Sequence, residues 1–315
     1  MIASERVVSE IVYLTCAIRF RDATAKLRQR NTDDNQPPQD SEIRVRNLKL
    51  ILSYDGSEFA GWQVQPDRTT VQGALASAIG RVSGENVLPQ GSGRTDAGVH
   101  ALAQVASFAT ASPMPVENWK VALNDILPSS VRVLEASEAE ADFHARRSAR
   151  SKSYRYRIVR SAICSPFLAR YVWHYPYPLD EKAMTSAADA VVGLHDFTSF
   201  AAVDPERMTR PTASLAGSPE QAKENEPSTN AEPTANSVRE VFSSCWTRDG
   251  DELVYDIRGT GFLHRMVRNL VGTFVLVGKG TLGRKDVERI LALRNRSAAG
   301  PTAPASGLFL VSVEY

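Results

Sequence analysis

The sequence predicts an α+β fold built from two similar halves. Segments with the alternating apolar pattern of strands and segments with helical apolar spacing are mixed along residues 46–315, without regular βα alternation. A hydrophobic fraction of 43% supports a sizeable core, and a length of 315 residues is typical of about two domains.

The first half begins with a strand followed by a capped helix. Apolar and more polar residues alternate along 46–54, which predicts a half-buried strand. A capping box at Thr69-x-x-Gln72, followed by apolar residues at helical spacing, predicts a helix that ends near Gly84. The same patterns predict a glycine-rich loop over 90–98, a helix over 116–127, and strands over 104–109, 131–135 and 154–160.

The second half repeats this mixture of elements. Asp180 is placed as the N-cap of a helix that runs to Gly193, and apolar residues from Phe262 to Val275 form one stripe of a further helix. We also expect strands over 238–247, 252–258 and 308–314 and a helix over 284–293.

Composition divides the chain into four parts. Residues 211–237 hold four prolines, and Leu215 is their one large apolar residue, so this stretch cannot bury enough surface to offset the entropy of ordering. We therefore expect a disordered insertion over about 204–237. The four parts are an N-terminal extension and linker over 1–45, an N-terminal half with the glycine-rich loop over 46–150, a C-terminal half over 151–315, and the insertion within that half.

The N-terminal extension has an apolar stretch over 11–18, but Glu5 and Glu10 precede it and no small-residue cleavage site follows. We interpret it as a non-essential extension and not as a targeting peptide. A cytoplasmic protein is expected, and no apolar run approaches the roughly 18–20 residues of a membrane span.

Several chemical classes find no support in the sequence. The three cysteines lie far apart without a CxxC pair, and the histidines show no metal-binding spacing, so we expect no metal and no disulfide scaffold. Gly278-x-Gly280-x-x-Gly283 matches a dinucleotide fingerprint, but it follows a helical stripe, so these glycines are interpreted as helix caps. His195 and Asp196 are interpreted as a turn in preference to a catalytic base with its orienting partner.

Positive charge is concentrated in two stretches, although the net charge is only +1. Residues 144–160 contain seven Lys or Arg and no acid, and residues 257–268 contain Arg258, Arg265 and Arg268 and no acid. Such stretches on a nearly neutral protein suggest contacts to phosphates, and solvated strand faces are the alternative.

The glycine-rich loop holds the residue best suited to chemistry. Asp96 lies two residues after Arg94, and in an extended segment both side chains point to the same side. A carboxylate kept charged by a nearby arginine can attack an electrophilic sugar carbon, as in retaining glycosidases. A simple Asx-turn of the carboxylate is the alternative.

The same loop resembles that of a known family. Residues 91–100, GSGRTDAGVH, are similar to the catalytic loop of the tRNA pseudouridine synthase A (TruA) family, whose hallmark is R-T-D-A-G-V-H-A. Further stretches resemble family motifs in the same order, namely residues 54–63, 142–146, 152–156, 195–200, 261–272 and 307–310. The resemblance covers residues 46–315 apart from the insertion.

The resemblance implies an isomerase, an intramolecular transferase that converts uridine to pseudouridine at positions 38, 39 and 40 of the tRNA anticodon stem-loop. It implies no cofactor, because nothing enters or leaves the substrate. It also implies ferredoxin-like halves with antiparallel sheets, an active site in the cleft between them, and a homodimer with tRNA as its partner. A non-catalytic RNA-binding protein on the same scaffold is the alternative function.

The resemblance also implies roles for particular residues. Asp96 matches the catalytic nucleophile, which either attacks the sugar C1′ or takes a proton from C2′. Arg94 is expected to hold the flipped nucleotide, or otherwise simply to pair with Asp96. Tyr154 is expected to stack on uracil, with a core aromatic as the alternative. Arg268 is expected to pair with Asp96, and either Leu308 or Leu310 to line the uracil pocket.

Overall fold

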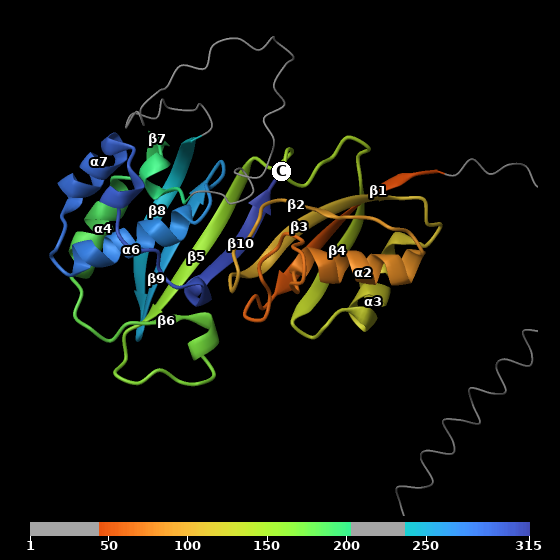
Figure 1. The fold of residues 1–315 in the computed structure, drawn as a ribbon, viewed down its shortest axis with the longest axis horizontal. Helices are drawn as coiled ribbons and strands as arrows, with labels where there is room; N and C mark the ends of the chain where they lie inside the picture. The colour runs from red at the N-terminus through yellow and green to blue at the C-terminus, as the bar shows by residue number, and fades with distance from the viewer. Residues whose placement is uncertain (1–43, 203–236) are drawn as a thin grey trace, which may run out of the picture. The chain divides into compact units, whose positions relative to one another are not determined.

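One sheet of ten strands runs through the part of the chain that the computed structural model describes, residues 44–202 and 237–315 (Figure 1). Its order is β4-β1-β3-β10-β5-β9-β8-β7, with β2 beside β3 and β6 beside β5. The strands are β1 Arg46–Tyr54, β2 Gln90–Gly91, β3 His100–Thr110, β4 Val131–Ala139, β5 Ser151–Val159, β6 Trp173–His174, β7 Gly193–Asp196, β8 Val238–Asp249, β9 Glu252–Gly259 and β10 Leu308–Glu314.

Neighbouring strands are antiparallel except at two places, where β10 pairs with β3 and β5 pairs with β6 in parallel. The expected mixed α/β character is thus confirmed, with a single large sheet through both parts of the chain. The ferredoxin-like character of each half and the boundary at 150/151 stay predictions. The extension over 1–43 and nearly all of the expected insertion lie outside the described residues.

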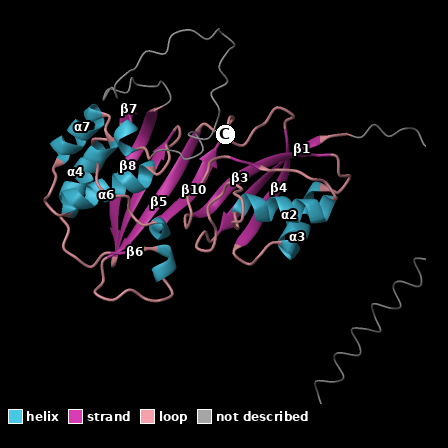
Figure 2. Ribbon diagram, in the orientation of Figure 1, coloured by secondary structure: helices cyan, strands magenta, loops and turns pink. Residues whose placement is uncertain are grey.

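One face of this sheet forms the core. Tyr54, Ala101, Leu310, Tyr154 and Ile257 are paired in one row across five strands, and each is at most 8% exposed. Residues paired across strands point to the same side of a sheet, so the whole row shares one buried face. Two groups of helices lie along the sheet, near β1–β4 and near β7–β9 (Figure 2). They are α2 Val71–Ser83 and α3 Val116–Ile126, and α4 Glu181–Asp189, α6 Met266–Gly278 and α7 Arg284–Leu293.

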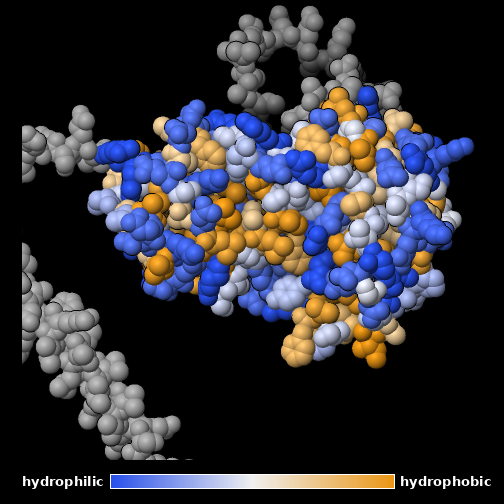
Figure 3. Space-filling view, turned by 180° about the vertical axis from the view of Figure 1, so that it is seen from behind, coloured by the Kyte–Doolittle hydropathy of each residue, from blue (hydrophilic) through white to orange (hydrophobic). Residues whose placement is uncertain are grey.

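The surface seen from behind mixes hydrophilic and hydrophobic residues (Figure 3).

On the face of the sheet away from the buried row, side chains of β5 and β9 form ion pairs. The pairs between the strands are Arg155–Asp256 at 2.8 Å and Arg157–Glu252 at 2.5 Å, and Arg160, directly after β5, pairs with Glu181 of α4 at 3.0 Å. Three of the seven basic residues of 144–160 thus have an acidic partner within the fold, while phosphate contacts by the others stay a prediction.

The structure corrects the expected start of two helices. The N-cap of α2 is Thr70, whose hydroxyl accepts from the Gly73 amide, and not Thr69. The expected partner Gln72 instead accepts from the Val64 amide and donates to the Pro89 carbonyl, so no capping box forms. Helix α6 begins at Met266 and not at 262, one turn later than expected, because Arg265 directly before it adopts a left-handed conformation with φ of 59°.

Two further interpretations are decided by the fold. His195 and Asp196 lie in strand β7, paired with β8, so their interpretation as a turn is wrong. Local residues could not reveal this strand, because its partner follows more than 40 residues later. Gly278 is the last residue of α6 and Gly280, with φ of 74°, follows it, which agrees with their interpretation as the end of that helix. Gly283 instead begins the next helix, as the N-cap of α7.

Helix α6 lies unusually close to the segment that precedes β10. A Cβ atom added to Gly272 would lie 1.7 Å from the Pro301 carbonyl oxygen, so only glycine allows this approach. The approach matters for the position of Arg268, because the Ala303 amide donates to the Arg268 carbonyl at 3.1 Å.

Replacing Gly272 by Ala should therefore destabilise the protein. Alanine gains about 1 kcal/mol in helix propensity, but a clash with a backbone carbonyl costs about 3 kcal/mol or more, since the carbonyl cannot rotate away. We expect a net loss of about 2 kcal/mol and a melting temperature lower by about 4–8 °C. Gly80→Ala in α2 is the matched control, because its Cβ would meet Glu85 O at an ordinary 3.4 Å. Equal melting temperatures for the two variants would contradict this prediction.

Candidate active site

A cleft of about 450 Å³ lies where segments distant in sequence meet. It is formed by the loop between β2 and β3, the beginning of β5, the segment before α6 and the first residue of β10. The residues that line it include Arg94, Asp96, Arg146, Lys152, Tyr154, Phe262, His264, Met266 and Leu308. Among the residues predicted from sequence, Arg94, Asp96 and Tyr154 therefore share one cleft.

The loop that carries Asp96 is fixed by its buried neighbour Thr95. The Thr95 hydroxyl is 2.8 Å from the Tyr54 hydroxyl, and the Thr95 carbonyl accepts from the Trp62 amide at 3.0 Å. Burial raises the pKa of Tyr54 to about 12, so this hydroxyl stays neutral at physiological pH. With Thr95 turned inward, Arg94 and Asp96 on either side of it both line the cleft.

The Asp96 carboxylate is held by two groups from the C-terminal part of the chain. Arg268 donates from Nη1 to Oδ2 at 2.7 Å, and His264 Nε2 lies 3.5 Å from Oδ1. Arg268 is itself oriented because its Nε donates to the Ala303 carbonyl at 2.8 Å. Within the described residues the Asp96 carboxylate is bonded by side chains, which does not support the Asx-turn alternative.

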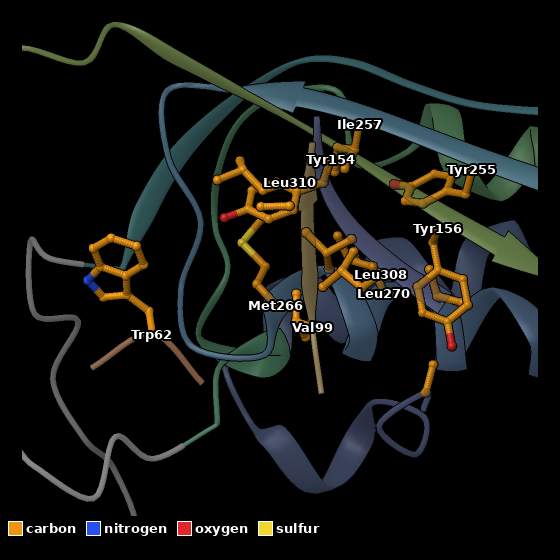
Figure 4. Packing of buried hydrophobic residues seen from close by; sticks show 14 of the residues in the cluster. Trp62, Val99, Tyr154, Tyr156, Tyr255, Ile257, Met266, Leu270, Leu308 and Leu310 are labelled. Atoms are coloured by element: carbon orange, nitrogen blue, oxygen red, sulfur yellow. The ribbon is translucent and has the colours of Figure 1, made fainter. Parts of the chain in front are cut away.

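Tyr154 forms an apolar wall of the cleft. Tyr154 is 8% exposed, and its ring lies edge to face with that of Phe262, with the ring centroids 5.0 Å apart. Figure 4 shows it packed near Met266 and Leu308. Burial raises the pKa of Tyr154 well above its ordinary value, so its hydroxyl is protonated at physiological pH. The ring can therefore offer an apolar face to a planar ligand.

Two neighbouring residues on these strands belong to the core and not to the cleft. Tyr156 is fully buried and donates to the Pro304 carbonyl at 2.8 Å, which is the core role considered for the tyrosines of this strand. Leu310 is also fully buried, whereas Leu308 lines the cleft. Leu308 is therefore the leucine placed to contact a ligand.

Sequence reasoning missed His264 and Lys152 as site residues. His264 follows a loop and has no fixed spacing to Asp96, so no local signal identified it. Lys152 could have been found, because it precedes Tyr154 by two residues on one strand and therefore shares its face.

The cleft is strongly positive. Its lining contains five basic residues and one acidic residue, Asp96. The basic residues are Arg68, Arg94, Arg146, Lys152 and Arg265. This excess of positive charge is suited to a polyanionic ligand.

No group of three or more His, Cys, Asp or Glu that could hold a metal occurs among the residues described. In the same part of the chain, no helix has the length and apolar character needed to cross a membrane.

Comparison with known proteins agrees with this geometry. A family model described as tRNA pseudouridine synthase matches residues 50–146 and 221–315. A protein named tRNA pseudouridine synthase A from Solibacter usitatus is 46% identical over 271 residues, which are 86% of this chain and 100% of the relative. A relative of the same name from Moorella thermoacetica is 44% identical over 270 residues, covering 85% of this chain and 99% of its own.

The contact between Asp96 and Arg268 should be visible as a thermodynamic coupling. Removing one partner of a buried ion pair costs about 3–5 kcal/mol, and side-chain exposures of 17% and 13% place this pair at the lower end. We expect Asp96→Asn combined with Arg268→Gln to cost less than the sum of the single variants, with a coupling of about 1–3 kcal/mol. Urea unfolding of the four proteins measures it, and additivity within about 0.5 kcal/mol would show that the pair contributes no coupling.

Proposed function

Because the chain belongs to the tRNA pseudouridine synthase family, we propose that it isomerises uridine to pseudouridine at positions 38, 39 and 40 of the tRNA anticodon stem-loop. The observation that carries this proposal is the Asp96 carboxylate, which is held by Arg268. Among the described residues it is the one acidic side chain that lines the cleft, where five Lys or Arg side chains surround it. Such a cleft combines a nucleophile with an environment that attracts RNA.

The reaction rearranges bonds within one nucleotide. The bond between uracil N1 and the sugar C1′ breaks, the uracil turns, and a bond forms between C5 and C1′. The proton on C5 is lost and N1 gains one, so atoms and electrons balance without a cofactor.

Asp96 is proposed as the residue that begins this reaction. Its carboxylate either attacks C1′, which forms a glycosyl ester, or removes a proton from C2′. Hydrogen bonding from Arg268 and the nearby His264 orients the carboxylate toward the cleft. A positioned carboxylate of this kind is the group used at sugar carbons by retaining glycosidases.

The uridine must leave the helical stack before it can reach Asp96, at a cost of a few kcal/mol. Tyr154 is proposed to stack on the extruded uracil, and Leu308 to contact it from β10. Arg94 is exposed at the cleft beside Asp96, where its guanidinium can hold the flipped nucleotide or fill the space that it leaves. The uracil would thereby exchange base stacking for an aromatic and apolar wall.

A non-catalytic RNA-binding protein would require the positive cleft but not the carboxylate. Asp96 is present and is oriented by an arginine that is itself hydrogen-bonded to the backbone. A carboxylate in the cleft would repel RNA phosphates unless it served another purpose. This observation favours the enzyme.

Asp96→Asn should abolish pseudouridine formation and largely retain tRNA binding. The substitution preserves shape but removes the nucleophile, whereas contacts to phosphates supply most of the affinity. Single-turnover pseudouridine formation and tRNA binding by the purified variant test this. Asp125→Asn, on the exposed surface of α3, is the matched control and should behave as the unmodified protein. Substantial turnover by Asp96→Asn would remove Asp96 from its proposed role.

We also propose a cytoplasmic homodimer that binds one folded tRNA across both subunits. One subunit places five basic residues around one cleft, and a two-fold arrangement doubles that surface. Light scattering should give the mass of a dimer, and tRNA binding should weaken steeply with salt as counterions are released. A monomer with full activity on a short unstructured RNA, or binding indifferent to salt, would contradict this proposal.

A further inference from the structure

We propose that Lys152 and Arg146 form a phosphate subsite on the Gly93 side of the cleft, which holds a phosphodiester of the RNA beside the reacting uridine. This inference rests on the proposed function, since it names the part of the RNA substrate that this side of the cleft would bind. It is carried by the contacts of Lys152 and by the distribution of charge within the cleft.

The first observation is the placement of the Lys152 ammonium. Its Nζ donates to the Ser92 carbonyl at 2.6 Å, and the side chain lines the cleft two residues before Tyr154. An ammonium has three donors, so this contact leaves two for a ligand. The carbonyl also fixes the ammonium in place, which reduces the entropy lost when a ligand binds.

The second observation is the space left by Gly93. A Cβ atom at this position would lie 3.2 Å from Lys152 Nζ and 4.0 Å from the Tyr154 hydroxyl. The absence of a side chain keeps the ammonium accessible from the cleft. A phosphate oxygen at this point would lie close to the tyrosine proposed to stack on the uracil.

The third observation is that these cations have no acidic partner. Among the described residues no carboxylate forms an ion pair with Lys152 or Arg146, whereas Arg155 and Arg157 on the same strand both have one. Arg146 is exposed at the cleft, and its backbone is fixed because its amide donates to His144 Nδ1 at 3.1 Å. Strand β5 thus pairs Arg155 and Arg157 with acids and directs Lys152 to the cleft, where Arg146 also lies.

The two sides of the cleft consequently differ in charge. Asp96 is balanced by Arg268 on one side, while Lys152 faces the cations Arg146 and Arg239 on the other. Burial, and secondarily these two arginines, lower the pKa of Lys152 to about 8. A bound phosphate would oppose both effects and so stabilise the charged form of Lys152.

A purely structural role for Lys152 is the competing explanation. Its contact with Ser92 joins β5 to the loop that carries Asp96, and loss of this contact alone could displace the loop. The two explanations differ in one measurable property. A phosphate contact contributes to the salt dependence of RNA binding, whereas an internal contact to a carbonyl does not.

The test measures the affinity of the full-length protein for an anticodon stem-loop RNA at several salt concentrations. Lys152→Gln should weaken binding about tenfold and reduce the slope of log Kd against log salt by about 1. Lys152→Arg should restore both, because arginine also binds phosphate. Lys120→Gln on the exposed face of α3 removes the same charge away from the cleft and should leave the affinity within about twofold of the unmodified protein.

The pH dependence of binding gives an independent measurement. Lysine binds phosphate only when protonated, so the unmodified protein should bind about threefold more weakly at pH 8.5 than at pH 7. The charged or titratable groups around Lys152 are Arg146, Arg239 and Tyr154, none of which changes charge in this interval. Lys152→Arg should lose this component of the pH dependence.

Unchanged affinity and salt slope in Lys152→Gln would overturn the subsite. Loss of activity or of thermal stability in that variant with a normal salt slope would equally overturn it, in favour of the structural role. Pseudouridine formation is measured on the same preparations. If the unmodified protein binds the RNA but forms no pseudouridine on any tRNA, the proposed function fails while the salt slope still decides the subsite.

Discussion

The cleft that holds Asp96 depends on the pairing of the last strand, β10, with two strands that are distant in sequence. β10 pairs in parallel with β3 through Phe309 and Leu310 and antiparallel with β5 over most of its length. The loop with Asp96 leads into β3, Tyr154 lies on β5, and Leu308 opens β10. Without β10 in this position the two strands would not be neighbours, and the carboxylate and the aromatic ring would not share a cleft.

A second set of contacts brings Arg268 to this junction. Helix α6 approaches the segment before β10 because Gly272 has no side chain, and Ala303 in that segment accepts from the Arg268 Nε. The guanidinium is thus held between a backbone carbonyl and the Asp96 carboxylate. Its geometry depends on close packing of the backbone, which tolerates little change in volume.

Charge is distributed unevenly around this framework. Arg155 and Arg157 on the outward face of β5 are paired with acids of β9, whereas Lys152 at the cleft donates to the Ser92 carbonyl. The protein is therefore nearly neutral as a whole and positive where the uridine would bind. Under the proposed function, this arrangement would attract RNA to the cleft more strongly than to the rest of the surface.

The sequence by itself determined the local features of this protein. Alternation along 46–54 predicted β1, and the stripe from 262 predicted α6 but began it one turn too early. The loop with Asp96 identified the family through its residues alone. These features depend on neighbours close in the chain, or on a motif that can be compared directly. The family also supplied the expectation that Arg268 pairs with Asp96, which the structure confirms as a contact.

Only the tertiary structure decided which basic residues form ion pairs, which of them line the cleft, and which residues distant in the chain come into contact. The seven cations of 144–160 look alike in sequence, but the register of β5 against β9 pairs some of them with acids and leaves Lys152 at the cleft. His264 reaches Asp96 because a left-handed residue, Arg265, redirects the chain before α6. Register and backbone reversal bring together residues that are far apart in the chain, so no local pattern in one sequence could specify them.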